Sequence, residues 1–249
     1  MGYGFGNRIA VGRRPITAVA QAGSSLATPY AWWGADYGVT QSGGYVTEWA
    51  DKSGNGKTLY PSGDYGPVYY ATGLQSKPAL FFVYDNKSGI VSSLMQASPD
   101  ATSIKSVVAV ALPVTGLGQY GCIIECSGGG LYSCVSADFK AGILYWGTYF
   151  GASNYYSYVY PEEPAIFAYS ANATGTLIRQ VKVDGIDEEI SSSVVGAGNT
   201  SRSDMVVGID SSFGQPSRSY LAELVLFDYE LTTGQLDAYI SLFRTKYGL

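Results

Sequence analysis

The sequence contains no histidine, only three cysteines, and few charged residues, which make up 14% of the chain. Without histidine, serine–histidine catalysis is excluded, and a zinc site would need a fourth cysteine or a carboxylate ligand. An odd number of cysteines does not suit a closed disulfide framework. We therefore interpret Cys122, Cys126 and Cys134 as small apolar residues of a sheet. One alternative stays open. If the Ser-Gly-Gly stretch after Cys126 is a hairpin loop, Cys122 and Cys134 lie opposite each other and could bridge under oxidation.

Long hydrophobic runs are also absent. No apolar run approaches the roughly 18 residues of a membrane-spanning helix, so we expect no membrane span. The N-terminus has no basic region followed by an apolar stretch, so we expect no secretory signal peptide. The formal net charge is −5. An acidic surface does not attract phosphate backbones, so we expect no nucleic-acid partner.

What the sequence does contain points to one fold class. Hydrophobic residues make up 46% of the chain, which includes 32 glycines and 22 tyrosines. Tyrosine favours strands and has a polar tip, whereas glycine serves turns and bulges. This composition indicates an all-β protein with many turns and a tyrosine-rich surface. A length of 249 residues fits one large β domain.

Short strand-like stretches alternate with turns along most of the chain, and we expect about a dozen strands. Residues 103–113 are the clearest core strand, because they are rich in β-branched side chains and end at a proline. Residues 120–126 and 131–138, on either side of residues 127–130, predict the two strands of a hairpin. Residues 176–190 predict another, because Asp184 and Gly185 are a preferred type I′ turn pair.

The C-terminal segment changes period from strand to helix. Its apolar residues recur at helical spacing: Leu236, Tyr239, Ile240, Phe243 and Tyr247. Thr232, with Gln235 three residues later, forms a capping box, and Gly248 is a typical helix stop. We therefore predict a helix over residues 232–247 that packs against the strands.

Residues 1–27 differ from the rest of the chain. They are rich in glycine, alanine and serine, and they show no sustained strand or helix period. We interpret them as an extended arm, because a glycine-rich segment cannot easily hold a shape by itself. The residues with which the arm would bind another chain are Tyr3, Phe5, Arg8, Ile9, Arg13 and Arg14. A partner groove could bury the apolar ones, and carboxylates on the partner suit the arginines.

Two stretches resemble one family. Residues 48–59, EWADKSGNGKTL, followed by KPAL at 77–80, are similar to the early signature of laminin-G-like domains of the concanavalin A-like superfamily. Residues 219–249 are similar to that family's closing strand, short linker and capped helix. The resemblance covers residues 28–249. It implies a concanavalin A-like jelly-roll sandwich of two antiparallel sheets with one C-terminal α-helix, outside which the extended N-terminal arm lies. Such a domain with a basic arm resembles proteins of tailed-phage virions.

The DKSGNG loop has two interpretations. The resemblance implies a corner of the fold, in which Asp51 and Asn55 hydrogen-bond nearby backbone and glycines take positive φ. A calcium site is the alternative, because Asp51, Ser53 and Asn55 offer oxygen ligands. Asp64 or Asp85 could complete that site if folding brought them near. We favour the corner and, apart from this calcium ion, predict no cofactor.

Jelly-roll glycanases of this superfamily resemble one another in a strand motif, Glu-x-Asp-x-Glu or Glu-x-Asp-x-x-Glu, whose alternation places the carboxylates on one face. This sequence has no such motif. Asp187, Glu188 and Glu189 follow the predicted turn and fan out at a hairpin tip. Glu223 and Asp228 are five residues apart, so they face opposite sides of a regular strand. We therefore predict that the chain is not an enzyme.

One aromatic-rich stretch is a candidate glycan site or protein interface. Its residues are Trp146, Tyr149, Asn154, Tyr155, Tyr156 and Tyr158. Aromatic rings can lie under the apolar face of a sugar, but tyrosine is also typical of cores and interfaces, which we favour here. Trp32 and Trp33 cannot both face inward along a strand, so we expect one to be exposed or covered by the arm.

The sequence thus predicts a non-enzymatic structural protein of a phage virion. It would dock on other virion proteins through residues 1–27 and display the jelly roll. Weak arm contacts act best when many copies act together, so we expect a homo-oligomer, with a trimer favoured. The alternative function is a lectin-like, carbohydrate-binding module for host-surface glycans. The two functions are compatible.

Overall fold

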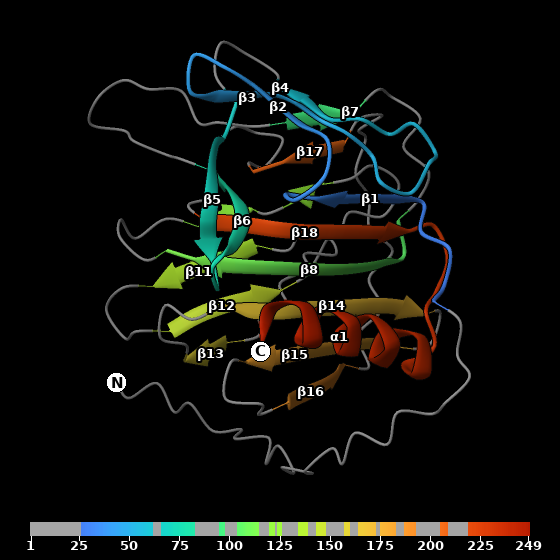
Figure 1. Cartoon of the computed structure of the whole chain (residues 1–249). Helices are drawn as coiled ribbons and strands as arrows, with labels where there is room; N and C mark the ends of the chain where they lie inside the picture. The colour runs from blue at the N-terminus through green and yellow to red at the C-terminus, as the bar shows by residue number, and fades with distance from the viewer. Residues whose placement is uncertain are drawn as a thin grey trace.

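A computed structural model of the chain describes residues 26–61, 66–82, 95–97, 104–114, 120–122, 124–125, 134–138, 143–147, 157–159, 164–172, 175–182, 187–192, 205–208 and 219–249. These residues form eighteen β-strands and one α-helix (Figure 1). Every strand pair among them is antiparallel.

The largest sheet has eight strands and carries most of the core. In spatial order it contains β16 (Asp187–Ser192), β15 (Gly175–Lys182), β14 (Ala165–Asn172), β8 (Ser106–Pro113), β18 (Ser219–Phe227), β6 (Lys77–Phe82) and β5 (Val68–Leu74). The eighth strand, β1 (Ala31–Gly34), shares one edge of β18 with β6. Strand β6 pairs with the first residues of β18, and β1 pairs with its later residues.

Smaller groups of strands complete the structure. One four-stranded sheet contains β10 (Ile124–Glu125), β17 (Met205–Val207), β7 (Met95–Ala97) and β4 (Tyr60–Pro61). Another contains β13 (Ser157–Val159), β12 (Ile143–Gly147), β11 (Cys134–Asp138) and β9 (Tyr120–Cys122). Strands β2 (Val39–Ser42) and β3 (Tyr45–Trp49) form a hairpin.

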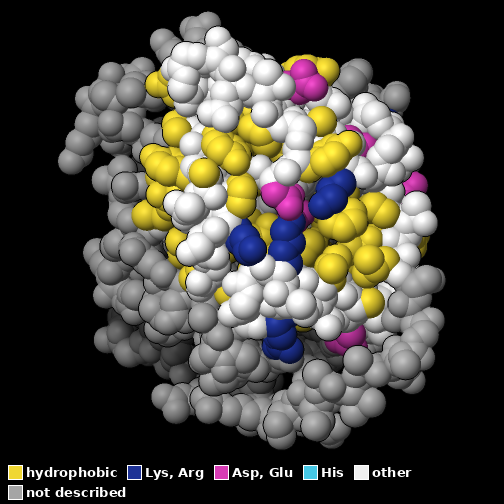
Figure 2. Space-filling model, viewed as in Figure 1, with side chains coloured by type: hydrophobic (Ala, Val, Ile, Leu, Met, Phe, Trp, Pro, Cys, Tyr) yellow, Lys and Arg dark blue, Asp and Glu magenta, His cyan; other side chains and the backbone are white. Residues whose placement is uncertain are grey.

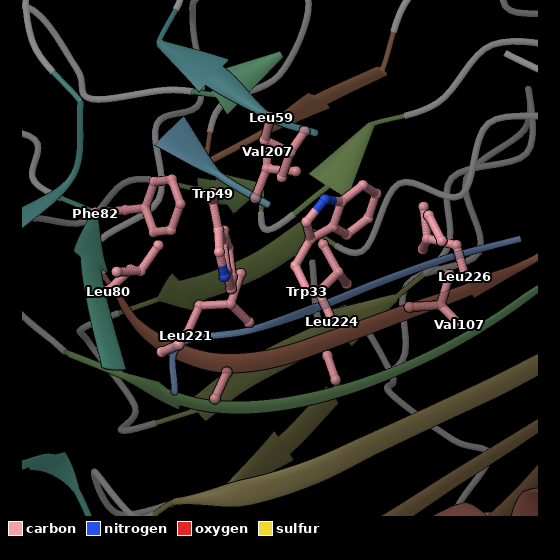
Figure 3. Close-up of a cluster of buried hydrophobic side chains, with 14 of the residues drawn as sticks. Trp33, Trp49, Leu59, Leu80, Phe82, Val107, Val207, Leu221, Leu224 and Leu226 are labelled. Atoms are coloured by element: carbon pink, nitrogen blue, oxygen red, sulfur yellow. The ribbon is translucent and has the colours of Figure 1, made fainter. Parts of the chain in front are cut away.

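The inner face of the large sheet packs against β3, β17 and Leu59, the residue before β4. Figure 3 shows Trp33 and Leu224 on the large-sheet side of this core, with Trp49, Leu59 and Val207 above them. All five side chains are fully buried. Burial of each large apolar side chain contributes about 1.5–3 kcal/mol. The two indole N–H groups donate to backbone carbonyls, so the core leaves neither donor unpaired.

Helix α1 (Thr233–Tyr247) covers the outer face of the large sheet and lies in front of it in Figure 1. The predicted signals set its limits. Thr232 and Gln235 form the capping box, and Gly248 ends the helix in the left-handed conformation with φ 68. The five apolar residues predicted from the helical spacing are all buried.

Because both faces of the large sheet are covered at its centre, strand β18 is apolar on both sides apart from Glu223, and residues 221–227 are all buried. Trp32 and Trp33 are divided between the two faces. Trp33 lies in the inner core, whereas Trp32 is half-buried on the outer face. The ring of Trp32 contacts Tyr239 and Phe243 of the helix, with centroid distances of 6.0 and 6.1 Å. Among the described residues, helix α1 therefore covers Trp32.

The structure confirms the predicted fold class, a sandwich of antiparallel sheets with one C-terminal helix. The two predicted hairpin pairings are present as β15–β16 and β9–β11, and Cys122 is the register partner of Cys134. One prediction is wrong in detail. Residues 120–126 were expected to form one strand, but Ile124 and Glu125 pair with β17 in another sheet. The arm residues 1–25 lie outside the described part of the chain.

Candidate functional site

The DKSGNG loop is built around the carboxylate of Asp51. Its Oδ1 accepts hydrogen bonds from the backbone N–H of Trp32 at 3.0 Å and of Ser53 at 2.8 Å. Its Oδ2 accepts from the Ser53 hydroxyl at 2.8 Å and from the Lys57 N–H at 3.0 Å. One side chain thus ties β1 to the segment that follows β3.

A second side chain fastens the same loop to the residues before β1. The amide of Asn55 donates to the carbonyls of Pro29 at 3.0 Å and of Tyr30 at 3.1 Å. Gly54 and Gly56 have φ angles of 88 and 70, in the left-handed region that favours glycine. This geometry is that of a structural corner, the interpretation that the sequence favoured.

The corner also bears on the predicted calcium site. Both oxygens of Asp51 are engaged by N–H or O–H donors, and a calcium ion would have to replace these donors. Within the described ranges, no three His, Cys, Asp or Glu side chains gather where they could hold a metal ion. Asp64 and Asp85, which could complete the site, lie outside those ranges.

A group of charged side chains, here called the ion cluster, lies where β18, the end of α1 and the turn after β1 meet. It consists of Glu223, Lys246 and Asp36, and Glu223 is fully buried. One Glu223 oxygen accepts a 2.7 Å hydrogen bond from Trp32 Nε1, and the other accepts from the Tyr247 hydroxyl at 3.0 Å and from Lys246 Nζ. Lys246 Nζ also donates to Asp36 at 2.7 Å. Figure 2 shows basic side chains gathered around acidic ones near the centre of this face.

The electrostatics favour the charged forms of Asp36 and Lys246. Burial alone would raise the pKa of Asp36, but the hydrogen bond and charge of Lys246, with the charge of Lys52 at 4.0 Å, hold that pKa below its ordinary value. Burial alone would lower the pKa of Lys246, but its hydrogen bonds to Asp36 and Glu223 raise it above the ordinary value. Burial, followed by the neighbouring Glu223, raises the pKa of the Tyr247 phenol.

The sequence makes room for this cluster at one glycine. Gly34 is the register partner of Glu223. A Cβ at this position would lie 2.8 Å from Asp36 Oδ1 and 2.9 Å from Glu223 Oε2. A register irregularity between Leu221 and Glu223 marks a bulge in β18, a device that re-aims side chains. The ion cluster therefore joins β1, β18 and α1 and has its hydrogen-bonding groups satisfied within the protein.

An open group of aromatic rings, here called the aromatic platform, lies on the same outer face at the β5 edge. It consists of Tyr70, Phe81 and Tyr220, from β5, β6 and β18. The ring centroids of Phe81 and Tyr220 are 4.5 Å apart, and Tyr70 lies 5.5 Å from Tyr220 and 6.1 Å from Phe81. Tyr70 is 43% exposed, and the other two are half-buried. Figure 2 shows hydrophobic side chains gathered on the left, where Figure 1 places β5 and β6.

The aromatic residues predicted for a glycan site or interface are only partly described. Trp146 lies in β12 opposite Val135, and Tyr158 lies in β13 opposite Leu144, so the two occupy neighbouring strands. The remaining predicted residues of that stretch, Tyr149, Asn154, Tyr155 and Tyr156, lie outside the described ranges, as do the six arm residues. Their roles stay predictions.

Sequence reasoning missed the aromatic platform and the lysine of the ion cluster. The signal available for the platform was the Tyr69-Tyr70 pair, since alternation along a strand turns one of two consecutive side chains outward. The signal for Lys246 was its place in the last helical turn beside Tyr247, on the face that carries the buried stripe. Neither signal predicts which residues of other strands these side chains contact.

No family model and no curated protein matches the sequence. Several solved structures match its fold. The receptor-binding domain of botulinum neurotoxin type G has a TM-score of 0.58 at 12% identity, over 87% of this chain and 52% of that one. Domain 4 of AbnA, a GH43 extracellular arabinanase from Geobacillus stearothermophilus in complex with arabinotriose, has a TM-score of 0.54 at 12% identity, over 87% and 100%. The binding domain of botulinum neurotoxin DC, in complex with rat synaptotagmin II, has a TM-score of 0.53 at 9% identity, over 88% and 52%.

At these identities the likeness shows the fold alone, a β-sandwich. The chain spans about half the length of the neurotoxin domains that it matches. Helix α1, the helix that the structure describes, is not long and apolar enough to cross a membrane.

Proposed function

We propose that this chain is a non-enzymatic β-sandwich module that binds carbohydrate. The observation that carries the proposal is the aromatic platform, whose Tyr70 ring is 43% exposed at the edge of the large sheet. Exposed aromatic rings provide rigid, amphipathic contact area at low entropic cost. A domain of similar fold has been solved with arabinotriose, which supports a sugar as the ligand class.

The ion cluster supports the non-enzymatic part of the proposal. A general acid or a nucleophile in glycoside hydrolysis needs a carboxylate that can reach the substrate. Glu223 is fully buried, and its two oxygens are engaged by Trp32, Lys246 and Tyr247. This carboxylate therefore acts in the fold and does not face a ligand.

The test is a binding screen of the full chain against immobilised polysaccharides and oligosaccharides, with sugar release followed in the same samples. We expect retention on at least one carbohydrate, competition by the same sugar in solution, and no release of reducing ends. Absence of binding to every carbohydrate would overturn the proposal. If the wild type releases sugar and Glu223→Gln does not, the non-enzymatic part of the proposal is overturned.

A structural role in a phage virion is the second candidate, and the way the described chain begins favours it. The carbonyl of Ala27 accepts a 2.6 Å hydrogen bond from the Tyr239 hydroxyl, and that of Thr28 accepts a 2.8 Å bond from the Tyr229 hydroxyl. The first described residues of the chain are thus fastened beside helix α1. An arm with a fixed root could dock the domain, as a trimer or other homo-oligomer, on virion proteins.

Deleting residues 1–25 tests this second role, because it removes the arm and keeps the hydrogen-bonded root. We expect the truncated protein to fold and to bind carbohydrate but to lose assembly with its partners, measured by co-sedimentation. Limited proteolysis supplies a second readout, since the arm should be protected only in the assembly. Equal protection in the isolated protein would contradict docking through the arm.

A further inference from the structure

Strand β5 is interrupted directly beside the aromatic platform. Its register with β6 shifts between Tyr70 and Leu74, so residues 71–73 have no register partner. Pro78 stands opposite this gap in β6 and has no N–H to donate to a neighbouring strand. Strand β5 is also the edge strand of the large sheet. Because a bulge leaves its extra residues out of the regular pairing, the backbone of residues 71–73 lacks register partners in β6.

The bulge and the platform adjoin each other. A Cβ on Gly73 would lie 2.9 Å from Tyr70 Cβ and 3.1 Å from Tyr220 Cδ1. Backbone can approach these two side chains so closely only because position 73 carries no side chain. Two neighbouring residues of the bulge, Ala71 and Thr72, are exposed. Polar backbone groups and an exposed ring thus meet at one place on the surface.

We propose that the platform and the bulge together bind one ring of a neutral sugar. This inference rests on the proposed function, because it assumes that the chain binds carbohydrate. A sugar ring has an apolar C–H face, which would stack on Tyr70, and hydroxyls at its rim, which would bond to the amides of residues 71–73. Ligand sites commonly combine such an apolar surface with a few placed backbone groups.

The charges of this face favour a neutral ligand. The described salt bridges of the outer face join Asp36, Lys52, Lys246 and Glu223. In the described ranges, lysine side chains lie over the rings of Trp32, Tyr30 and Tyr247, none of which belongs to the platform. The three platform residues contribute only rings and phenol hydroxyls, and the bulge contributes amides and one threonine hydroxyl. The one charged residue of β5 and β6 is the exposed Lys77, at the opposite end of β6 from Phe81. The groups of the platform and the bulge match hydroxyls better than carboxylates.

The size of the platform favours a small ligand over a protein. A stable protein interface buries about 800 Å² on each partner, over about 20–30 residues. The platform offers three rings, of which one is more than a third exposed. The other exposed large hydrophobic side chains of the described ranges, on other segments of the chain, are Leu26, Tyr37, Tyr60 and Tyr229. A patch of this size fits one sugar ring.

The test compares the wild type and three variants of the full chain on immobilised neutral polysaccharides of glucose, galactose, mannose and arabinose, and on an acidic polysaccharide of galacturonic acid. Tyr70→Ala removes the exposed ring, Tyr70→Phe keeps the ring and removes the hydroxyl, and Tyr60→Ala is the matched control. Tyr60 is 53% exposed and lies in β4, away from the platform. We expect Tyr70→Ala to weaken binding at least about tenfold, Tyr70→Phe to restore most of it, and Tyr60→Ala to leave it unchanged.

The outcomes separate this inference from the proposed function. If the wild type binds a neutral sugar and Tyr70→Ala binds it equally well, the platform is not the site, although the proposed function stands. Binding confined to acidic sugars would refute the neutral ligand alone. If the wild type binds no carbohydrate, the proposed function and this inference both fall. Circular dichroism of each variant shows whether it is folded, and rescue by Tyr70→Phe excludes a general loss of structure.

Discussion

The ion cluster and the aromatic platform lie on one face and share strand β18, yet they differ in what they leave open. Glu223 follows Tyr220 by three residues in that strand. Glu223 is 0% exposed and has partners for both oxygens, whereas Tyr70, at the platform, is 43% exposed. A cluster of charged groups is often interpreted as a functional site. Here the satisfied charges stabilise the fold, and the rings remain available for contact.

Removing the lysine of the ion cluster should have the largest effect. In Lys246→Met the buried Glu223 loses its countercharge, and breaking a buried pair from one side typically costs about 3–5 kcal/mol. The free energy of unfolding from denaturant titration measures the loss. Lys105→Met is the control, since Lys105 is exposed, and it should change stability by less than about 0.5 kcal/mol. A loss below about 1 kcal/mol in Lys246→Met would show that the ion cluster is not a main support of the fold.

The corner loop should respond next. Asp51→Ala leaves three backbone N–H groups and one hydroxyl without their acceptor, so we expect a loss of about 1–3 kcal/mol. Asp228→Ala, at an exposed acid, is the control. Denaturant titration measures this loss, and thermal unfolding with excess calcium or a chelator tests the alternative site. We expect no calcium-dependent shift in the melting temperature, and a shift that disappears in Asp51→Ala would establish the calcium site instead.

Filling the space beside the platform should have a smaller effect on stability. Gly73→Ala places a Cβ 2.9 Å from Tyr70 Cβ and 3.1 Å from the Cβ of Ala79. The edge strand can shift outward, so we expect a cost near the lower end for overpacking, about 1 kcal/mol. The near-ultraviolet circular dichroism of the rings should change as well. An unchanged aromatic spectrum would mean that the bulge does not position the platform.

The pH dependence of stability should show the smallest effect. The folded pKa of Lys246 is raised, so its contribution is complete below the ordinary lysine pKa of about 10.4 and is lost as pH rises through the folded pKa. The folded pKa of Asp36 is lowered, so its contribution is present above about pH 3.9 and is lost as pH falls through the folded pKa. Denaturant titrations across both ranges should show that Lys246→Met lacks the alkaline loss and Asp36→Asn lacks the acid loss. Equal profiles in wild type and variants would contradict these assignments.

The features that the sequence predicted well are those whose partners are close in the chain. The capping box of Thr232 and Gln235, and the corner that Asp51 makes with Ser53, each depend on residues two or three positions apart. Core strands could likewise be predicted, because alternation or a continuous apolar run is a local pattern. These features do not require knowledge of strand pairing.

The features that could not be predicted depend on register between distant strands. Trp32 Nε1 reaches Glu223 across 191 residues of sequence. The platform exists because β6 lies between β5 and β18 in the sheet order and places Phe81 opposite Tyr220. The pairing of Ile124 and Glu125 with β17, in a different sheet from β9, could not be predicted for the same reason. In the sequence the two segments form one continuous strand-like run. No local pattern contains this information.

One denaturant titration tests the central comparison most directly, because it needs no knowledge of the ligand. The free energies of unfolding of Lys246→Met and Tyr70→Ala are measured side by side with the wild type. We predict a loss of about 3–5 kcal/mol for Lys246→Met and at most about 1.5 kcal/mol for Tyr70→Ala, whose ring contacts lie at the surface. If Tyr70→Ala destabilises the protein as much as Lys246→Met does, the platform is part of the core, and the distinction between a closed ion cluster and an open binding surface is contradicted.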